Sequence, residues 1–88
     1  MTFKFAGALL RLVDYQRLLQ YEATTVQGAI QALVAHYPAV KPLLLDEQVR
    51  IRKSHRLYLN GAPIDDEDMQ SALTKDDCIQ IVTAVAGG

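Results

Sequence analysis

The alternation of apolar and polar side chains predicts a strand at the beginning of the chain. In residues 2–7, Phe3 and Phe5 fall on one face and Lys4 on the other, which is the two-residue period of a half-buried strand. Residues 8–14 are apolar without a clear period, and we expect their leucines to fold back on the core, as a connection or as a short amphipathic turn. Residues 16–22 favour a second strand, because they contain an aromatic side chain and precede a strong helix start.

The clearest predicted element is an amphipathic helix in the first half of the chain. The run Thr24-Thr25-Val26-Gln27 fits a capping box, in which the Thr24 side chain accepts a hydrogen bond from the Gln27 backbone while the Gln27 side chain reaches back. A single apolar stripe follows at helical spacing, formed by Val26, Ala29, Ile30, Leu33, Val34 and Tyr37. Pro38 ends the helix, and the stripe must lie on a sheet because so short a helix is marginal by itself in water. One further helical turn is expected within residues 39–47.

The second half of the chain contains a hairpin signal. Residues 57–59 are predicted as a strand that ends in a type I′ turn at Asn60-Gly61, because both central positions of that turn need a positive φ. The returning strand, 62–64, includes Pro63, which has no N–H for a ladder, so we expect this strand at a sheet edge. A last strand is predicted at 79–83.

Acidic and basic residues are each concentrated in one stretch. The acids at 65–68 are expected to open a short helical segment that reaches Leu73, and a metal site there is disfavoured because the spacing of a calcium loop is absent. Residues 48–56 contain four of the nine basic residues, Arg50, Arg52, Lys53 and Arg56. They lack the interleaved aromatics of a nucleic-acid site, so a solvated connector is favoured, with docking on an acidic partner surface as the alternative.

Composition and charge limit the class of protein. With 88 residues, half of them hydrophobic and 22% charged, the chain is expected to be one small folded domain without a deep active-site cleft. The net charge of −1 attracts neither nucleic acid nor an anionic membrane, and the longest apolar run is far too short to span a bilayer. The single cysteine excludes an internal disulfide, and the first residues lack a signal-peptide pattern, so a cytoplasmic location is expected.

The sequence contains none of the motifs that usually indicate catalysis. There is no Gly-rich phosphate loop, no nucleophile elbow and no paired metal-ligand spacing. We expect His36 to neutralise part of the helix dipole, His55 to lie in the basic connector without a partner nearby in sequence, and Cys78 to be an inert, partly buried thiol. An enzyme is therefore disfavoured.

The last five residues, Ala84-Val85-Ala86-Gly87-Gly88, point to a tail that other proteins handle. Glycine has no Cβ, so the carboxylate of Gly88 is unhindered and the last two peptide units can pass through a narrow passage. At ~3.3 Å per extended residue, the tail could reach roughly 16 Å into another protein. From the residues alone a second interpretation stays open, namely a disordered terminus or a cloning scar.

The order of these elements, together with three short motifs, resembles the MoaD/ThiS family of ubiquitin-like sulfur carriers. The motifs are the ending Val85-Ala86-Gly87-Gly88, the turn Tyr58-Leu59-Asn60-Gly61 and the approach to the last strand at 73–77; the ending is most similar to the CysO/QbsE type. The resemblance covers the whole chain. It implies an α+β, β-grasp fold with a mixed four- to five-stranded sheet packed on one main helix. It divides the chain into a β-grasp domain (1–83) and a flexible C-terminal tail (84–88).

The resemblance also implies a function for the tail. An E1-like adenylating enzyme of the ThiF/MoeB type would use ATP to activate the carboxylate of Gly88, while Gly87, Ala86 and Val85 thread into its active site. A sulfur donor would then displace AMP and leave a thiocarboxylate. The carrier itself would catalyse nothing and bind no metal or cofactor. Its sulfur would pass to an acceptor such as a cysteine-synthase-like protein, and a JAMM-type metalloprotease would remove any residues beyond the glycines.

Partner docking is expected on the exposed face of the sheet, near the base of the tail. The family docks through an apolar patch, and the matching positions here are Ala6, Pro63 and Val82, which are smaller than the aromatic or leucine side chains sometimes found there. Arg50 and Arg52 are expected to add charge to the contact. The alternatives are the small subunit of molybdopterin synthase, a thiazole-pathway carrier, a ubiquitin-like protein modifier and a non-covalent interaction module.

Overall fold

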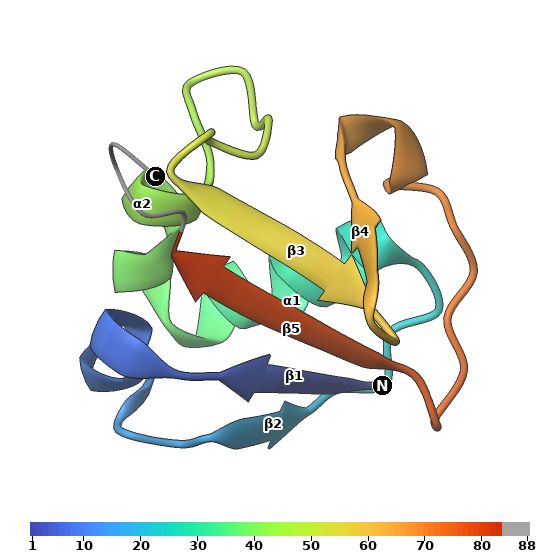
Figure 1. Cartoon of the computed structure of the whole chain (residues 1–88), viewed down its shortest axis with the longest axis horizontal. Helices are drawn as coiled ribbons and strands as arrows, with labels where there is room; N and C mark the ends of the chain where they lie inside the picture. Colours follow the sequence, from blue (N-terminus) through green and yellow to red (C-terminus); the bar gives the residue numbers. More distant parts are fainter. Residues whose placement is uncertain (84–88) are drawn as a thin grey trace.

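The computed structural model describes residues 1–83, which form a five-stranded sheet with its main helices on one face (Figure 1). The strands are β1 (Thr2–Phe5), β2 (Leu18–Gln20), β3 (His55–Leu59), β4 (Ala62–Ile64) and β5 (Cys78–Thr83). The α-helices are α1 (Val26–His36) and α2 (Lys41–Leu44), and the short 3-10 helices are η1 (Gly7–Val13), η2 (Pro38–Val40) and η3 (Asp66–Asp68). The predicted tail, 84–88, lies outside the described residues.

The last strand, β5, occupies the centre of the sheet. The strand order is β2-β1-β5-β3-β4, and each neighbouring pair is antiparallel except β1 and β5. Because β1 and β5 run in the same direction, they finish at the same end of the sheet, where Phe5 pairs with Ile81. β3 runs the other way and starts at that end, where His55 pairs with Thr83. The described chain therefore ends in the middle of one end of the sheet.

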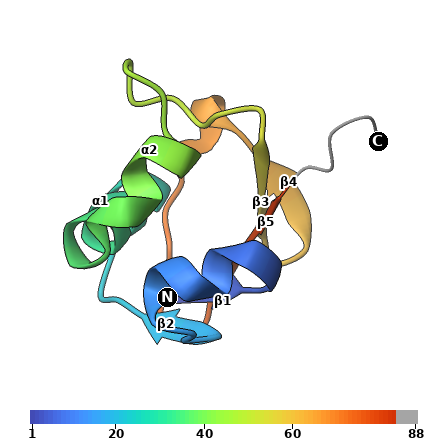
Figure 2. The ribbon, with the colours of Figure 1, turned by 90° about the vertical axis from the view of Figure 1, so that its left-hand side faces the viewer.

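The two faces of the sheet have different surroundings. Figure 2 shows α1 and α2 together on one side of the sheet, and no helix of the described part covers the other side. Five strand side chains that face the helices are 2% exposed or less: Phe3, Phe5, Leu57, Ile79 and Ile81. The predicted stripe of α1 packs against them through Val26, Ala29, Ile30 and Leu33, and it continues in the partly buried Val34 and Tyr37. Within residues 1–83 no helix combines the length and the apolar character needed to cross a bilayer.

The start of α1 is one residue later than predicted. Thr25, not Thr24, is the N-cap, and its hydroxyl accepts a hydrogen bond from the Gly28 N–H at 3.0 Å. Thr24 is held outside the helix because its carbonyl accepts a hydrogen bond from the Leu73 N–H at 2.8 Å. The predicted return bond from the Gln27 side chain is replaced by a contact with the Gln70 side chain at 2.6 Å.

The backbone pairing between residues 24–26 and 71–73 also shortens the predicted acidic helix. η3 has the expected acidic N-terminus, with Asp65 as N-cap and with the Asp68 side chain accepting a hydrogen bond from the Asp65 N–H. It ends at Asp68 and does not reach Leu73. Residues 71–73 are instead held beside 24–26, where the Val26 N–H donates to the Ser71 carbonyl at 3.2 Å. A contact between segments far apart in sequence has overridden a local helical preference.

The hairpin agrees with the sequence prediction except at its start. Asn60 and Gly61 have φ values of 51° and 88°, as a type I′ turn needs, and β4 with Pro63 is an edge strand. β3 begins at His55, two residues before the predicted strand, so the basic connector is shorter than expected. The segment after β1 forms η1, which buries Leu9, one of the leucines predicted to fold back on the core, and also Val13.

Candidate functional site

The face of the sheet that carries no helix is formed by the strand residues that alternate with the core. Lys4 pairs with Leu18 on one side and with Gln80 on the other, and Arg56 pairs with Val82. Paired residues on adjacent strands point to the same face, so these side chains share one surface. We call it the open face; its strand positions are Thr2, Lys4, Leu18, Gln20, Arg56, Tyr58, Pro63, Cys78, Gln80 and Val82.

We call the end of this face at which β5 finishes the tail root; it consists of Thr83 and its neighbours Ala6, His55, Arg56 and Val82. Ala6 directly follows the Phe5–Ile81 pair, so it lies next to Val82 on one side of β5. Arg56 lies next to Val82 on the other side. The predicted sulfur-carrying residue Gly88 and the threading residues Gly87, Ala86 and Val85 follow this point and lie outside the described residues.

The structure brings together two of the three predicted apolar docking residues. Ala6 is exposed and Val82 is half-buried, and they are neighbours at the tail root. Pro63 shares the open face but lies on β4, two strands from β5, where it pairs with Tyr58. The side chains of Tyr58 and Arg56 on β3 therefore separate Pro63 from the apolar pair.

The two arginines predicted to assist docking lie outside the strands, in the connector between α2 and β3. The Nε of Arg52 donates to the carbonyls of Pro42 at 2.9 Å and Leu45 at 3.1 Å. Part of the Arg52 guanidinium thus holds the end of α2. Arg50 stays in the loop, and Arg56 is the basic residue of this stretch that reaches the open face.

The loop that carries Arg50 is organised by one carboxylate. Asp46 Oδ1 accepts hydrogen bonds from the backbone N–H groups of Gln48 at 2.8 Å and Arg50 at 3.0 Å. The bond from the Arg50 backbone is the main cause that lowers the pKa of Asp46. Between these donors, Val49 is 57% exposed and has a φ of 61°, a conformation that a β-branched residue rarely adopts.

Sequence reasoning missed a large apolar side chain that is exposed on the open face. Leu18, on the edge strand β2, is 59% exposed and pairs with Lys4. Tyr15 is 72% exposed in the turn that precedes β2, at the same end of the sheet as the tail root. Alternation within residues 16–22 already places Leu18 and Gln20 on one face, but the sequence does not show that this strand lies at the edge.

His55 lies beside the tail root and points into the core, with 9% of its surface exposed. Its Nδ1 is 3.0 Å from Ser54 Oγ, so the expectation of no partner nearby in sequence is wrong: the adjacent residue supplies one. Burial lowers the pKa of His55, and a hydrogen bond with the Leu43 backbone partly offsets this effect. Burial therefore favours the neutral form of the ring at the start of β3.

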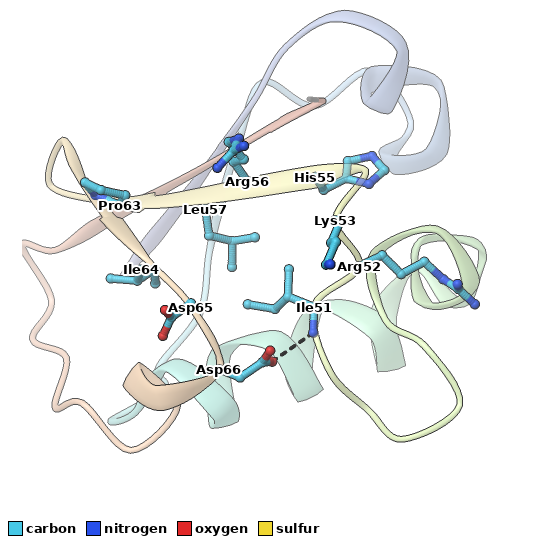
Figure 3. Close-up of a pocket in the computed structure, with 10 residues that line it drawn as sticks. All are labelled: Ile51, Arg52, Lys53, His55, Arg56, Leu57, Pro63, Ile64, Asp65 and Asp66. Carbon is cyan, nitrogen blue, oxygen red and sulfur yellow. Dashed lines mark hydrogen bonds between the residues drawn. The ribbon is translucent and has the colours of Figure 1, made fainter. Parts of the chain in front are cut away.

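An open groove of about 430 Å³ lies beside the first half of β3 (Figure 3). Basic side chains come from the connector and β3, acidic ones come from the end of β4 and from η3, and the Ile51 N–H donates to Asp66 Oδ1 at 2.9 Å. Its lining residues are Ile51, Arg52, Lys53, His55, Arg56, Leu57, Pro63, Ile64, Asp65 and Asp66. Among the described residues no group of His, Cys, Asp or Glu could hold a metal ion. The groove offers charges of both signs, which suits recognition by a protein.

At the other end of β5 the chain is fixed by side-chain hydrogen bonds. Asn60 donates through Nδ2 to Asp77 Oδ1 at 2.9 Å and accepts at Oδ1 from the Cys78 N–H at 2.9 Å. Asp77 also accepts from the Thr74 N–H at 2.7 Å, and the bond from Asn60 is the main cause that lowers the pKa of Asp77. Cys78 is half-buried, as expected, and lies about 17 Å along β5 from Thr83 at ~3.3 Å per residue.

The remaining histidine is the last residue of α1, where the sequence placed it near the helix end. His36 Nδ1 and the Tyr21 hydroxyl are hydrogen-bonded at 2.9 Å, which joins α1 to the segment after β2. Burial raises the pKa of Tyr21, so its hydroxyl keeps its proton. This contact is structural and lies away from the tail root.

The mixed sheet packed on α1, with β5 central, is the β-grasp architecture of ubiquitin-like proteins. Solved structures confirm the predicted fold: SAMP1 from Haloferax volcanii matches with a TM-score of 0.84 and 21% identity, over 100% of this chain and 98% of that chain. A chain of the Amycolatopsis orientalis BexX/CysO complex matches with a TM-score of 0.84 and 19% identity, over 99% and 98%. CysO from Mycobacterium tuberculosis matches with a TM-score of 0.82 and 20% identity, over 96% and 98%.

The chain belongs to the ThiS family, whose model matches residues 4–88. This match covers nearly all of the sequence and includes the Gly-Gly ending, in agreement with the resemblance to MoaD/ThiS-type carriers. A search of curated proteins gave no match. The family thus defines the chain as a ubiquitin-like protein of the sulfur-carrier type.

Proposed function

We propose that this chain carries sulfur as a thiocarboxylate on Gly88. The observation that carries the proposal is the match to the ThiS family, which extends through both terminal glycines. The sheet topology supports it, because the central strand β5 brings the end of the described chain, Thr83, to the middle of one end of the sheet. The side chains at that point, Ala6 and Val82, are small enough to leave the end accessible to a partner.

In the proposed reaction the chain is a substrate of partner enzymes. An E1-like enzyme of the ThiF/MoeB type binds ATP, a carboxylate oxygen of Gly88 attacks the α-phosphorus, and pyrophosphate leaves. A sulfur donor then attacks the acyl carbon of the adenylate, and AMP leaves. Glycine at both terminal positions suits these steps, because no Cβ shields the acyl carbon or widens the threaded segment.

The folded domain contributes position to this chemistry. Sulfur attached to a protein reaches an acceptor at a high effective concentration once the protein docks, without release of free sulfide. We propose a cysteine-synthase-like acceptor, a JAMM-type metalloprotease that acts on any longer precursor, and a cytoplasmic reaction. The likeness to CysO, seen in one case in a complex with BexX, supports partner enzymes for this chain.

Intact mass spectrometry tests the proposal. The chain is incubated with the ThiF/MoeB-type enzyme of the same organism, ATP and a sulfur donor, and the expected product has one oxygen replaced by sulfur. The Gly88→Val variant is expected to lose at least about 90% of this product, since its Cβ lies at the reacting carbon. Its thermal unfolding midpoint should equal that of the unchanged chain. Normal thiocarboxylate yield from this variant would contradict the proposal.

A protein modifier is the second candidate, favoured by the likeness to the small archaeal modifier proteins. A modifier would end in an isopeptide bond between Gly88 and a lysine of another protein. The same incubation with cell extract distinguishes the two functions. Ladders of higher mass that contain this chain support the modifier, and a free thiocarboxylate without ladders supports the carrier.

A further inference from the structure

The proposed function requires an enzyme to close on the tail root. Five residues follow Thr83, and they span at most roughly 16 Å when extended. The active site that modifies Gly88 must therefore lie within that distance of Thr83. Such an enzyme necessarily contacts the surface around the tail root, and the open face has two sides that it could use: the β3–β4 side and the β1–β2 side.

We propose that the activating enzyme docks on the open face at the tail root and along its β1–β2 side, on a patch formed by Lys4, Ala6, Leu18, Arg56 and Val82, in which Arg56 on β3 forms the border. We call this the β2-side patch. The proposal rests on the proposed function, because its partner is the enzyme that adenylates Gly88. The partner surface is expected to be apolar and bordered by carboxylates.

Exposure is the first argument for this side. The large apolar side chains that the described residues leave exposed are Tyr15, Leu18, Leu43 and Val49. Leu18 alone among them lies on a strand, and its pairing with Lys4 places it on the open face. Leu43 is in α2 and Val49 in the loop after it, on the helical side of the molecule. Leu18 is therefore the large apolar side chain that the strand positions of the open face leave exposed.

Charge is the second argument. Lys4 and Arg56 are the charged residues among the strand positions of the open face within residues 1–83, and both are cationic and exposed. Lys4 lies between Leu18 and Gln80, and Arg56 lies beside Val82, so cations flank the apolar side chains. Electrostatic complementarity then favours carboxylates on the partner.

The two edges of the sheet supply the third argument. At the β4 edge, Pro63 has no N–H to offer a further strand. At the β2 edge, the Phe5 N–H donates to the Arg17 carbonyl at 2.9 Å, so Arg17 directs its backbone groups toward β1. Because these groups alternate along an antiparallel strand, Leu18 directs its own N–H and carbonyl outward. An extended segment of the partner can therefore pair with β2 and can pair less well with β4.

Enzyme kinetics with the full chain test the β2-side patch. ATP–pyrophosphate exchange by the ThiF/MoeB-type enzyme of the same organism is measured against the concentration of the chain. The Leu18→Asp variant is expected to raise KM about tenfold or more and to change kcat less than about twofold, because docking and not chemistry is impaired. Leu18→Met should keep KM within about twofold of the unchanged chain, since it keeps an apolar side chain of similar volume.

The matched control is Val49→Asp, which places the same charge at a residue of nearly equal exposure on the helical side. Aspartate tolerates the positive φ of this position, so the variant should fold and its KM should stay unchanged. A KM for Leu18→Asp equal to that of the unchanged chain, or an equal increase in both aspartate variants, overturns the patch.

A second variant keeps the test decisive if Leu18→Asp fails to fold by circular dichroism. The double variant Lys4→Glu, Arg56→Glu changes exposed side chains only, and it is expected to raise KM about tenfold and to weaken the dependence of KM on salt. An unchanged KM in this variant overturns the patch. Absence of exchange with the unchanged chain would instead overturn the proposed function itself.

Discussion

The two faces of β5 specify different properties of the protein. On the covered face, Ile79 and Ile81 are 0% and 1% exposed and pack against the helices. On the open face, Gln80 and Val82 are half-buried, and cations lie beside them on β1 and β3. Because side chains alternate along a strand, a shift of one residue moves a side chain from the buried face to the face on which we propose docking. The comparison teaches that the fold needs size and apolarity on one face and leaves the other face free for the docking that we propose.

The strongest way to break this comparison is to shorten neighbouring residues on the two faces. Ile81→Ala is expected to lower the free energy of unfolding by about 2–5 kcal/mol, because it leaves a cavity at a fully buried site. Val82→Ala should cost about 0.5 kcal/mol or less, since the side chain is half-buried and faces no helix. Urea unfolding measures both values. Similar losses in the two variants would show that the open face also maintains the fold.

The covered face is the part of the molecule that the sequence predicts best. Phe3, Phe5 and the α1 stripe repeat with the periods of a strand and a helix, and burial follows directly from those periods. The N-cap and the length of η3 were predicted less well, because the pairing of 71–73 with 24–26 joins segments that are far apart in the sequence. Local propensity contains no information about that contact.

The open face could be predicted only in part. Ala6 and Val82 are expected there only from the resemblance to the family, and the register of β1 and β5 places them next to each other. Leu18 was missed because its exposure depends on β2 being the outermost strand, which is a property of the sheet order. Arg52 was assigned to docking, but its bonds to the carbonyls of Pro42 and Leu45 show that part of its side chain is used within the domain.

A smaller effect on the free energy of unfolding is expected at the N-terminus of α1, the helix that packs on the covered face. Thr25→Ala is expected to lower the free energy of unfolding by about 1 kcal/mol, because the N-terminal turn loses the hydroxyl that accepts from Gly28. Thr24→Ala should cost about 0.5 kcal/mol or less, since Thr24 acts through its backbone carbonyl, which the substitution keeps. Thermal and urea unfolding of the two variants decide between the caps. A larger loss for Thr24→Ala would restore the cap predicted from the sequence.

The smallest expected effect concerns two neighbours at the start of β3, His55 on the covered face and Arg56 on the open face. Burial lowers the pKa of His55 in the folded chain. The unfolded chain, in which a histidine has a pKa of about 6.5, therefore takes up the proton first as the pH falls. The stability that the neutral ring contributes is therefore present above that pH and is lost as the pH falls through the lower pKa of the folded state.

In His55→Asn the free energy of unfolding should decline less steeply between about pH 6.5 and pH 5, measured by urea unfolding at a series of pH values. Arg56→Gln, which changes the exposed neighbour on the open face, should leave the slope as it is. If the pH dependence of the free energy of unfolding is the same in His55→Asn and in the unchanged chain, the buried ring is not the group that causes it. The contrast between a covered face that stabilises the fold and an open face that does not would then fail at the tail root.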